Sequence, residues 1–457
     1  MRLDARPVAT EKGALKNAAR NNRRQDSLGK VGHCVACKEE RVKGKSKKAA
    51  SYCMPAFPIY SLQRRRRDLT GHTVADFTFS KASFSRDTIG HTVFSEQAPM
   101  PIRIFQRAVT ILLYASTLCA AHAATLPAAV PSREYTHAHT LVDIDHGRRL
   151  NLFCLGEGSP TVIFEAGLGE DSITFRNVQR AVASFTRACS YDRAGFGFSD
   201  AAQRPSDARH IVDDLHQLIV HAPLATPVVL VGHSIGGLYE SLYAATFPND
   251  VAGLLFIDPA FVGQDDVITA HWSAAQKQAW KKQDNDDLAQ ARQCLAWAKQ
   301  GDLLRPRRAD CLDDPPNRDP LIHQALDRES NQAKEQAAYL SEMEQGVSPA
   351  DGSLSASAIE VRDAHPNFAD MPLVVLTAGN QFQQYPTAQA STAKAAWMSG
   401  HDRIANLSTQ GRNILIERSG HNIQTDRPEA VVKYIKQIVT QIRKSAPASE
   451  KKAAAVG

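Results

Sequence analysis

The sequence predicts an α/β protein built on a mostly parallel β-sheet covered by helices. From about residue 138, short apolar runs rich in Val, Ile and Leu alternate with longer amphipathic stretches, a pattern typical of strands separated by helices. One run, Val228–Val231, turns through Gly232-His233-Ser234-Ile235-Gly236 directly into a helical stretch. A strand, a Gly-x-Ser-x-Gly turn and a helix in this order are typical of a nucleophilic serine, so the same feature also points to chemistry.

The predicted strands are eight short apolar runs. The first two flank Asp145-His146-Gly147, whose residue types favour a tight turn, so these strands are expected to form a hairpin. The later runs are separated mostly by helical stretches, which favours a parallel arrangement. The eight runs are residues 140–144, 150–155, 161–164, 188–192, 228–231, 252–257, 371–376 and 413–416.

Helices are predicted between these runs. Ser206 supplies an N-cap for a helix at 207–221, whose apolar residues recur on one face. Those residues are Ile211, Leu215, Leu218 and Ile219. Between residues 263 and 370 the composition shifts to Ala, Gln, Lys and Asp with helical periodicity. Other helices are expected at 173–185, 238–245 and 429–442.

Residues 1–99 form a basic leader that differs from the rest of the chain. They hold twenty Lys and Arg against nine Asp and Glu, so their net charge is +11. Because the whole chain has a net charge of +6, the residues after them are negative in sum. Without a periodic apolar pattern the leader is expected to be disordered. A nucleic-acid-binding arm with Cys34-x-x-Cys37 as half a zinc site is the alternative. No second C-x-x-C completes such a site, so neither a metal nor a nucleic-acid partner is expected.

Residues 100–123 have the pattern of a secretory signal peptide. Met100 precedes two arginines, a short apolar run at 108–115 and the small-residue site Ala121-His122-Ala123. The run is too short for a permanent membrane span. We expect translation to start at Met100 and the mature protein to begin near Ala124 as a secreted or periplasmic chain, with residues 124–137 as a linker. A buried apolar helix in a chain that starts at Met1 is the alternative.

Four cysteines remain after the signal peptide, and an even number suits an oxidising compartment. They are Cys154, Cys189, Cys294 and Cys311. Three pairings are possible, and four free thiols are the alternative. A Cys294–Cys311 bond is favoured because it would close a short loop in a helical region.

Four motifs in order resemble those of the α/β-hydrolase family, specifically its esterase-like and C–C-hydrolase-like members with a lid. The resemblance covers about residues 138–262 and 371–440. The motifs are Glu165-Ala166-Gly167-Leu168-Gly169, Tyr191-Asp192-Arg193-Ala194-Gly195-Phe196-Gly197, Gly232-His233-Ser234-Ile235-Gly236-Gly237 and Ser419-Gly420-His421.

The resemblance implies an eight-stranded sheet with helices on both faces and a helical cap inserted after the sixth strand. The implied core covers 138–262 and 371–444, the cap 263–370, and a disordered tail 445–457. The family's second and fourth strands are neighbours, which favours a Cys154–Cys189 disulfide. In the cap, Trp272, Trp280 and Trp297 either line a substrate pocket or pack the lid onto itself, and both interpretations stay open.

The chemistry of a serine nucleophile requires a base and a carboxylate. The hydroxyl of Ser234 is a poor nucleophile at neutral pH, so a histidine must accept its proton, and a buried carboxylate must orient that histidine. The resemblance places the base at His421, in the loop after the last strand. His233 adjoins the nucleophile, but neighbouring residues of the turn point apart, so His233 is interpreted as a packing residue.

The carboxylate that would orient His421 is indicated less directly by the sequence. Many family members carry it after the seventh strand, where residues 377–382 of this chain offer none. Asp258, at the end of the sixth strand, occupies the position that some lidded relatives use. Asp370 and Asp402 are the alternatives.

The oxyanion that forms during acyl transfer needs preorganised hydrogen-bond donors. The resemblance implies the backbone N–H groups of Ile235, directly after the nucleophile, and of Leu168, in the glycine-rich loop after the third strand. The family usually has His-Gly at the start of that loop, whereas this chain has Ala166-Gly167. Because the donor is backbone, the substitution need not abolish the site.

The predicted function is therefore a carboxylic-ester hydrolase, or an enzyme acting on a related acyl bond, that works through an acyl-enzyme without cofactor or metal. Its partner is expected to be a small-molecule substrate. A serine in the turn argues against dehalogenase and epoxide-hydrolase chemistry, for which relatives use Asp. C–C bond hydrolysis and perhydrolysis use the same residues and stay open, as does a non-catalytic receptor on the same scaffold.

Overall fold

The computed structural model describes residues 127–301, 303, 311, 319–349 and 351–445, all of which belong to one unit of the chain, Pro55–Gly457. The predictions for the basic leader, the signal peptide and the start of the linker lie outside the described residues. The same holds for the predicted tail from residue 446 onward.

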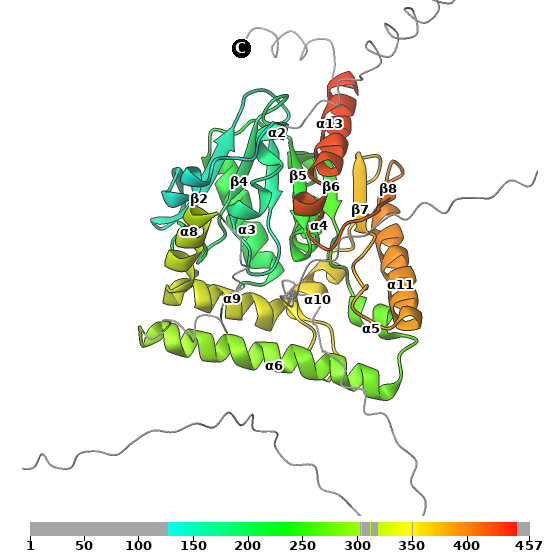
Figure 1. Cartoon of the computed structure of the whole chain (residues 1–457). Coiled ribbons are helices and arrows are strands. Elements are labelled where there is room, and N and C mark those ends of the chain that lie inside the picture. The colour runs from blue at the N-terminus through cyan, green and yellow to red at the C-terminus, as the bar shows by residue number, and fades with distance from the viewer. Residues whose placement is uncertain (1–126, 302, 304–310, 312–318, 350, 446–457) are drawn as a thin grey trace, which may run out of the picture. The chain divides into compact units, whose positions relative to one another are not determined.

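The described part of the chain is built on one eight-stranded sheet in the order β1-β2-β4-β3-β5-β6-β7-β8 (Figure 1). The antiparallel pairs are β1 with β2 and β2 with β4, and all other neighbours are parallel. The α/β class and the mostly parallel sheet are thus confirmed, and β2 makes the sheet mixed. The strands are β1 (Thr140–Asp145), β2 (Arg148–Leu155), β3 (Val162–Glu165), β4 (Ala188–Tyr191), β5 (Val228–His233), β6 (Val251–Ile257), β7 (Leu373–Ala378) and β8 (Arg412–Ile416).

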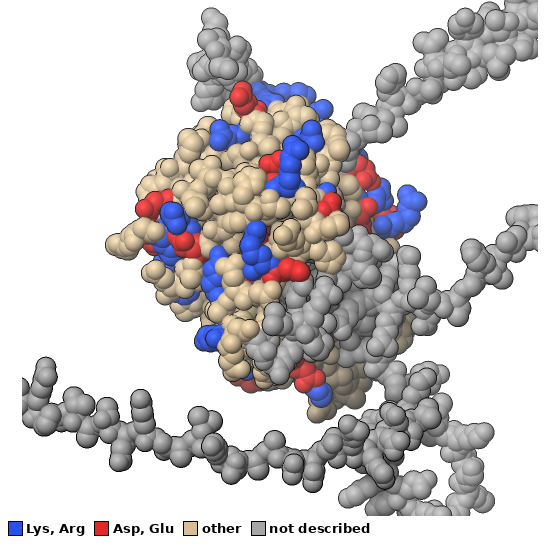
Figure 2. Space-filling model, turned by 60° about the vertical axis from the view of Figure 1, so that its left-hand side comes forward, with Lys and Arg blue, Asp and Glu red and all other residues tan. Residues whose placement is uncertain are grey.

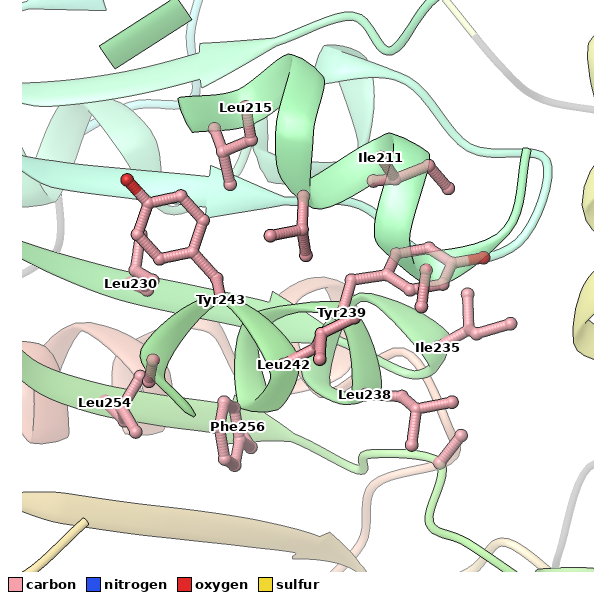
Figure 3. Close-up of a cluster of buried hydrophobic side chains, with 14 of the residues drawn as sticks. Ile211, Leu215, Leu230, Ile235, Leu238, Tyr239, Leu242, Tyr243, Leu254 and Phe256 are labelled. Carbon is pink, nitrogen blue, oxygen red and sulfur yellow. The ribbon is translucent and has the colours of Figure 1, made fainter. Parts of the chain in front are cut away.

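Helices cover both faces of the sheet. Strand β5 is buried on both sides, and its side chains alternate: Leu230 joins the cluster under one set of helices, and Val229 joins the cluster under the other. The first set is α3 (Ala208–His221), α4 (Ile235–Thr246) and α11 (Thr387–Ala405). The second includes α2 (Gln179–Val182), α12 (Ile423–Asp426) and α13 (Pro428–Ser445). Figure 3 shows side chains of α3 and α4 meeting those of β5 and β6.

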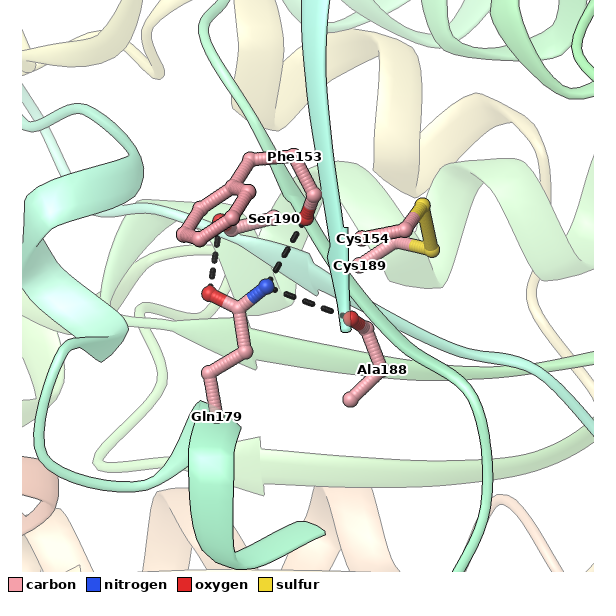
Figure 4. Close-up of a disulfide and its surroundings, with 6 residues drawn as sticks. All are labelled: Phe153, Cys154, Gln179, Ala188, Cys189 and Ser190. Atoms are coloured by element: carbon pink, nitrogen blue, oxygen red, sulfur yellow. Dashed lines mark hydrogen bonds between the residues drawn. A yellow bond between two sulfur atoms is a disulfide. The ribbon is translucent and has the colours of Figure 1, made fainter. Parts of the chain in front are cut away.

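The prediction of one helix at 173–185 is wrong. A 3-10 turn η2 (Ser172–Phe175) is followed by the single helical turn α2, because tertiary contacts hold this segment against the sheet. Gln179 is fully buried; its amide donates to the carbonyl oxygens of Phe153 at 2.8 Å and Ala188 at 3.2 Å, and accepts from the hydroxyl of Ser190 at 2.9 Å (Figure 4).

Both predicted disulfides are confirmed. Cys154 of β2 and Cys189 of β4 are register partners on adjacent strands, with Cα atoms 4.0 Å apart (Figure 4). Cys294 and Cys311 are joined with Cα atoms 5.6 Å apart.

A helical insertion separates β6 from β7, in the segment predicted as the cap. It contains α5 (Gln264–Thr269), α6 (Ala274–Lys299), α8 (Pro320–Ser330), α9 (Ala333–Gly346) and α10 (Ala356–Asp363). Helix α6 begins with a capping box formed by Ser273 and Gln276. It packs along α9, while α10 packs on α3 and α4 (Figure 1). Trp272 and Trp280 pack edge to face at 5.4 Å, which is a contact within this segment.

Part of the segment predicted as a linker is packed structure. Residues Ser132–Thr136 form the 3-10 helix η1, and the buried side chains of Val130 and Tyr135 cluster with Phe153 of β2 and Ile322 of α8. The N-terminal end of the described chain is therefore held between the sheet and the insertion.

The surface of the described part carries both signs of charge. Figure 2 shows Lys and Arg interspersed with Asp and Glu on the face in view. No helix within the described ranges has the length and apolar character needed to cross a membrane.

Candidate active site

Ser234 lies at the sharp turn between β5 and α4, in an unusual backbone conformation. Its φ is 54° and its ψ −123°, a region that a residue with a side chain occupies only when the surrounding structure enforces it. Small neighbours make the turn possible. A Cβ on Gly232 would lie 2.6 Å from the nitrogen of Gly237, and one on Gly236 would lie 2.6 Å from the carbonyl oxygen of Ala166. The local sequence thus explains the turn.

His421 and Asp258 are brought together from the ends of two strands. Nδ1 of His421, in the loop after β8, lies 2.7 Å from Oδ2 of Asp258, which directly follows β6. Of the three candidate acids, Asp258 is the one placed against His421. The carboxylate of Asp402 instead accepts a hydrogen bond from Asn413 at 2.9 Å, and Asp370 offers its backbone carbonyl to Gln410.

The carboxylate of Asp258 is fully buried and well supplied with donors. Its Oδ1 accepts hydrogen bonds from the N–H of Ala378 at 2.9 Å and from the indole of Trp397 at 2.8 Å. Burial alone would raise the pKa of Asp258, but the hydrogen bond and charge of His421 and the other donors outweigh burial and lower it. An ionised carboxylate only accepts, so Nδ1 of His421 is the donor in this contact, and in a neutral imidazole with that tautomer the lone pair lies on Nε2.

The hydroxyl of Ser234 is not joined to His421 by a hydrogen bond, and none links it to any other described residue. Ser234 is buried, whereas the side chain of His421 is 20% exposed. Catalytic hydrogen bonds of this kind often shorten only when substrate binds.

The loop after β3 contains a backbone amide, that of Leu168, which no described residue binds. The N–H of Gly167 donates to Glu170 at 2.8 Å, and the N–H of Gly169 donates to Glu342 at 2.9 Å. The N–H of Leu168, between them, has no acceptor among the residues that the structure describes. The same is true of Ile235, the first residue of α4, whose N–H precedes the helical hydrogen-bond ladder.

His233 is buried, as the packing interpretation expects, and its ring also makes two polar contacts. Its Nδ1 lies 2.8 Å from the carboxylate of Glu170, and its Nε2 lies 3.3 Å from the carbonyl oxygen of His421. Burial alone would lower the pKa of His233, but the charge of Glu170 outweighs this effect and raises it. Burial would raise the pKa of Glu170, yet His233 and the N–H of Gly167 bring it down to about 2. The buried His233 and the half-buried Glu170 form an ion pair beside the candidate site.

Arg193 forms a second ionic contact at this loop. Its guanidinium donates to Glu165 at 2.7 Å and to Glu342 at 2.6 Å, and it also donates to the carbonyl oxygens of Ala166 and Gly167. Sequence reasoning included Arg193 in a motif but gave it no role. It missed Glu342, which lies in the helical insertion and carries no local signal.

One group of possible metal ligands occurs in the described part of the chain, away from these residues in sequence. Glu134, His137 and His139 have ligand atoms within 4.8 Å of one another. Nε2 of His139 already lies 2.8 Å from the carbonyl oxygen of Glu134, and the carboxylate of Glu134 accepts from Arg133. These residues belong to η1 and the stretch before β1.

The fold and the strand–turn–helix geometry at Ser234 agree with the family whose model the sequence matches. Residues 162–434 match the model described as "Alpha/beta hydrolase family". The chain belongs to the α/β-hydrolase family. Members of this family share the sheet and the nucleophile turn. Their catalytic residues lie on loops at the carboxyl ends of the strands.

Individual α/β-hydrolase relatives are distant. The chain is 23% identical to the uncharacterised protein YqjL of Bacillus subtilis over 276 residues, which cover 60% of this chain and 82% of that protein. It is 31% identical to an uncharacterised protein of Schizosaccharomyces pombe over 146 residues, covering 26% of this chain and only 27% of that protein. The solved structure of DbjA has a TM-score of 0.51 at 16% identity and covers 68% of this chain and 100% of that one, a likeness in fold alone.

Proposed function

We propose that this α/β-hydrolase is a serine hydrolase that cleaves an ester or related acyl bond of a small molecule. The observation that carries the proposal is the 2.7 Å contact between His421 and the buried Asp258. That contact leaves Nε2 of His421 free to accept a proton, and Ser234 occupies the strained turn typical of a nucleophile.

The reaction uses only groups of this chain and water. The Ser234 hydroxyl attacks the acyl carbon while Nε2 of His421 takes its proton, and the N–H groups of Leu168 and Ile235 receive the negative oxygen. Collapse of the tetrahedral intermediate releases the alcohol, which His421 protonates. Water then attacks the acyl-enzyme with His421 as base, releasing the acid and restoring Ser234. Asp258 stays ionised throughout and supports the imidazolium.

A non-catalytic receptor on this scaffold is the rival from another class. It would be favoured if no carboxylate lay within reach of His421. The buried Asp258 lies at hydrogen-bond distance from His421, so this argument for a receptor does not apply. The serine at the turn also favours acyl chemistry over the dehalogenase and epoxide-hydrolase reactions, in which relatives use Asp.

Export from the cytoplasm is part of the proposal. The pattern at residues 100–123 is that of a signal peptide, and the two disulfides support export because such bonds persist in oxidising compartments.

Labelling and turnover of the full chain test the triad. We expect a fluorophosphonate to label the protein and p-nitrophenyl esters to be hydrolysed, with Ser234→Ala abolishing both. Asp258→Asn should lower kcat by about 10⁴-fold, because the amide favours the wrong tautomer of His421. Asp402→Asn, which alters a carboxylate bound to Asn413, is the matched control and should retain activity. Turnover that survives Ser234→Ala, or a wild-type chain that is neither labelled nor active, would contradict the proposal.

A further inference from the structure

The loop that carries Leu168 is held from two sides by carboxylates of different origin. Glu170, in the loop itself, takes the N–H of Gly167, whereas Glu342 reaches in from α9 to take the N–H of Gly169. With both neighbouring amides engaged, Leu168 is left as the amide available to a ligand. Its direction therefore depends on a residue of the helical insertion, 173 positions from Gly169.

The carboxylate of Glu342 also pairs with the guanidinium of Arg193. One oxygen of Glu342 lies 2.6 Å from Nε of Arg193, while the other bonds both Arg193 and the N–H of Gly169. Both charged side chains are buried, and Arg193 in turn binds the carbonyl oxygens of Ala166 and Gly167. The Arg193–Glu342 pair thus contacts the N–H of Gly169 and the carbonyl oxygens of Ala166 and Gly167 in this loop.

Helix α9 makes further close contacts with the segments around the site. Nζ of Lys334 donates to the carbonyl oxygens of Gly197 and Ser199 at 2.8 and 2.6 Å. The ring of Tyr339 lies so close to Gly169 that a Cβ there would be 2.6 Å from it. At the end of α9, Gly346 lies against the side chain of Ile235, the residue that supplies the other free N–H.

We propose that Glu342 is a positioning residue that couples the seating of α9 to the readiness of the oxyanion donors. When α9 lies on the core, Glu342 holds Gly169 and Arg193, and Leu168 presents its N–H to the developing oxyanion. When α9 lifts, the N–H of Gly169 loses its acceptor and the buried guanidinium of Arg193 keeps only Glu165 of its two carboxylate partners, so the loop loses its fixed geometry. The inference rests on the proposed function, because it concerns the backbone donors that bind the oxyanion in that reaction.

The expected size of the effect follows from the role of Glu342. Removing an oxyanion donor outright costs about 10²–10³ in kcat. Misplacing a donor while keeping it costs up to about 10²-fold. A positioning residue should change transition-state binding more than ground-state binding, so kcat should fall while KM changes little.

Glu342→Gln in the full chain, compared with Glu344→Gln, tests the inference. Glu344 lies on the same helix, is partly exposed and pairs with Arg292 of α6, so it reports any general effect on the insertion. We expect Glu342→Gln to lower kcat for p-nitrophenyl esters about 10- to 100-fold and Glu344→Gln to leave it unchanged. The affinity of a trifluoromethyl ketone, whose hemiketal adduct carries an oxyanion, should fall by the same factor as kcat/KM.

The possible outcomes separate the inference from the function on which it rests. A folded Glu342→Gln enzyme with wild-type kcat would overturn the inference while the hydrolase assignment stands. A lower kcat with unchanged ketone affinity would overturn it as well, because the loss would then lie outside the oxyanion donors. A wild-type chain that neither hydrolyses esters nor reacts with a fluorophosphonate would instead refute the proposed function.

Hydrogen exchange in the wild-type chain covers the case in which Glu342→Gln fails to fold. The Gly169 amide is bound to α9, so a peptide spanning residues 166–170 should open together with peptides of α9 as urea is increased. Opening of α9 at a urea concentration that leaves residues 166–170 protected would overturn the coupling. This readout requires no enzymatic activity.

Discussion

At the scale of single residues, the candidate site is distinguished by how its charged groups are paired. The buried Asp258 and the half-buried Glu170 each face a histidine, yet they support different parts of the site. Asp258 orients His421, whose Nε2 stays free. Glu170 binds His233 and the loop amide of Gly167. One pair therefore orients the proposed base, and the other links the loop after β3 to the turn that carries Ser234.

The ion pair of Glu170 and His233 should make stability depend on pH in a defined window. The pKa of Glu170 is lowered to about 2, so its contribution is present above the ordinary carboxyl range, near 4.5, and is lost as pH falls toward 2. The pKa of His233 is raised above its ordinary 6.5, so its contribution is complete below that value and is lost as pH rises through the raised pKa.

We therefore expect Glu170→Gln to lower the free energy of unfolding by about 1–3 kcal/mol. The loss should be largest between about pH 4.5 and 6.5, where both groups are charged. Urea unfolding across pH 4 to 9 measures it, with Glu344→Gln as the control for an exposed pair. A loss that is the same at every pH would show that the charge of His233 contributes nothing.

At the scale of elements, helix α9 determines how closely the insertion fits the core. Gly169 allows this fit in two ways: its φ is +68°, and a Cβ would collide with the ring of Tyr339. Lys334 and Glu342 of the same helix bind core segments on either side of that contact. The helix is thus fixed at three points along its length.

Gly169→Ala should weaken this contact and lower kcat. Backbone strain at a positive φ costs about 1–3 kcal/mol, and the collision adds to it. Gly301→Ala separates the two effects, because Gly301 has nearly the same φ, +69°, with nothing within 4 Å of its Cβ. We expect the loss of kcat to exceed any loss in Gly301→Ala, and Tyr339→Ala to restore part of it in the double variant. A double variant no more active than Gly169→Ala would rule out the collision as the cause.

At the scale of the whole molecule, one disulfide joins two strands of the core and a second disulfide lies within the insertion. The Cys154–Cys189 bond closes a loop with a sequence separation of 35, and the Cys294–Cys311 bond one with a separation of 17. Longer loops lose more entropy in the unfolded chain when they are cross-linked. The core disulfide should therefore contribute more to stability.

Replacing Cys154 and Cys189 by Ser should lower the free energy of unfolding by about 4 kcal/mol, against about 3 kcal/mol for the Cys294 and Cys311 pair. Urea unfolding of the oxidised chain and both double variants measures this difference. Mapping of non-reduced peptides from the protein in its native cell tests export at the same time. Both bonds should be present there, and four free thiols would contradict the proposed location.

The architecture was largely predictable because its signals are local. Apolar runs of strand length and the glycines around Ser234 act through neighbouring residues, so the strands and the nucleophile turn could be read in order. The prediction of a helix at 173–185 was wrong because the deciding contacts are distant in sequence. The buried amide of Gln179 bonds to two strands, and two short turns form in place of a continuous helix.

The sequence by itself determined the α/β sheet, the turn at Ser234 and, through family resemblance, the approximate places of His421, Asp258 and the two backbone donors. Only the tertiary structure decided which of three aspartates faces His421, that Glu170 raises the pKa of His233, and that Glu342 holds the loop of Leu168. The physical reason is sequence distance. His421 and Asp258 are 163 positions apart, and Glu342 and Gly169 are 173 apart, so no local pattern links them. Such pairs meet only when the sheet has formed and the inserted helices have packed on it.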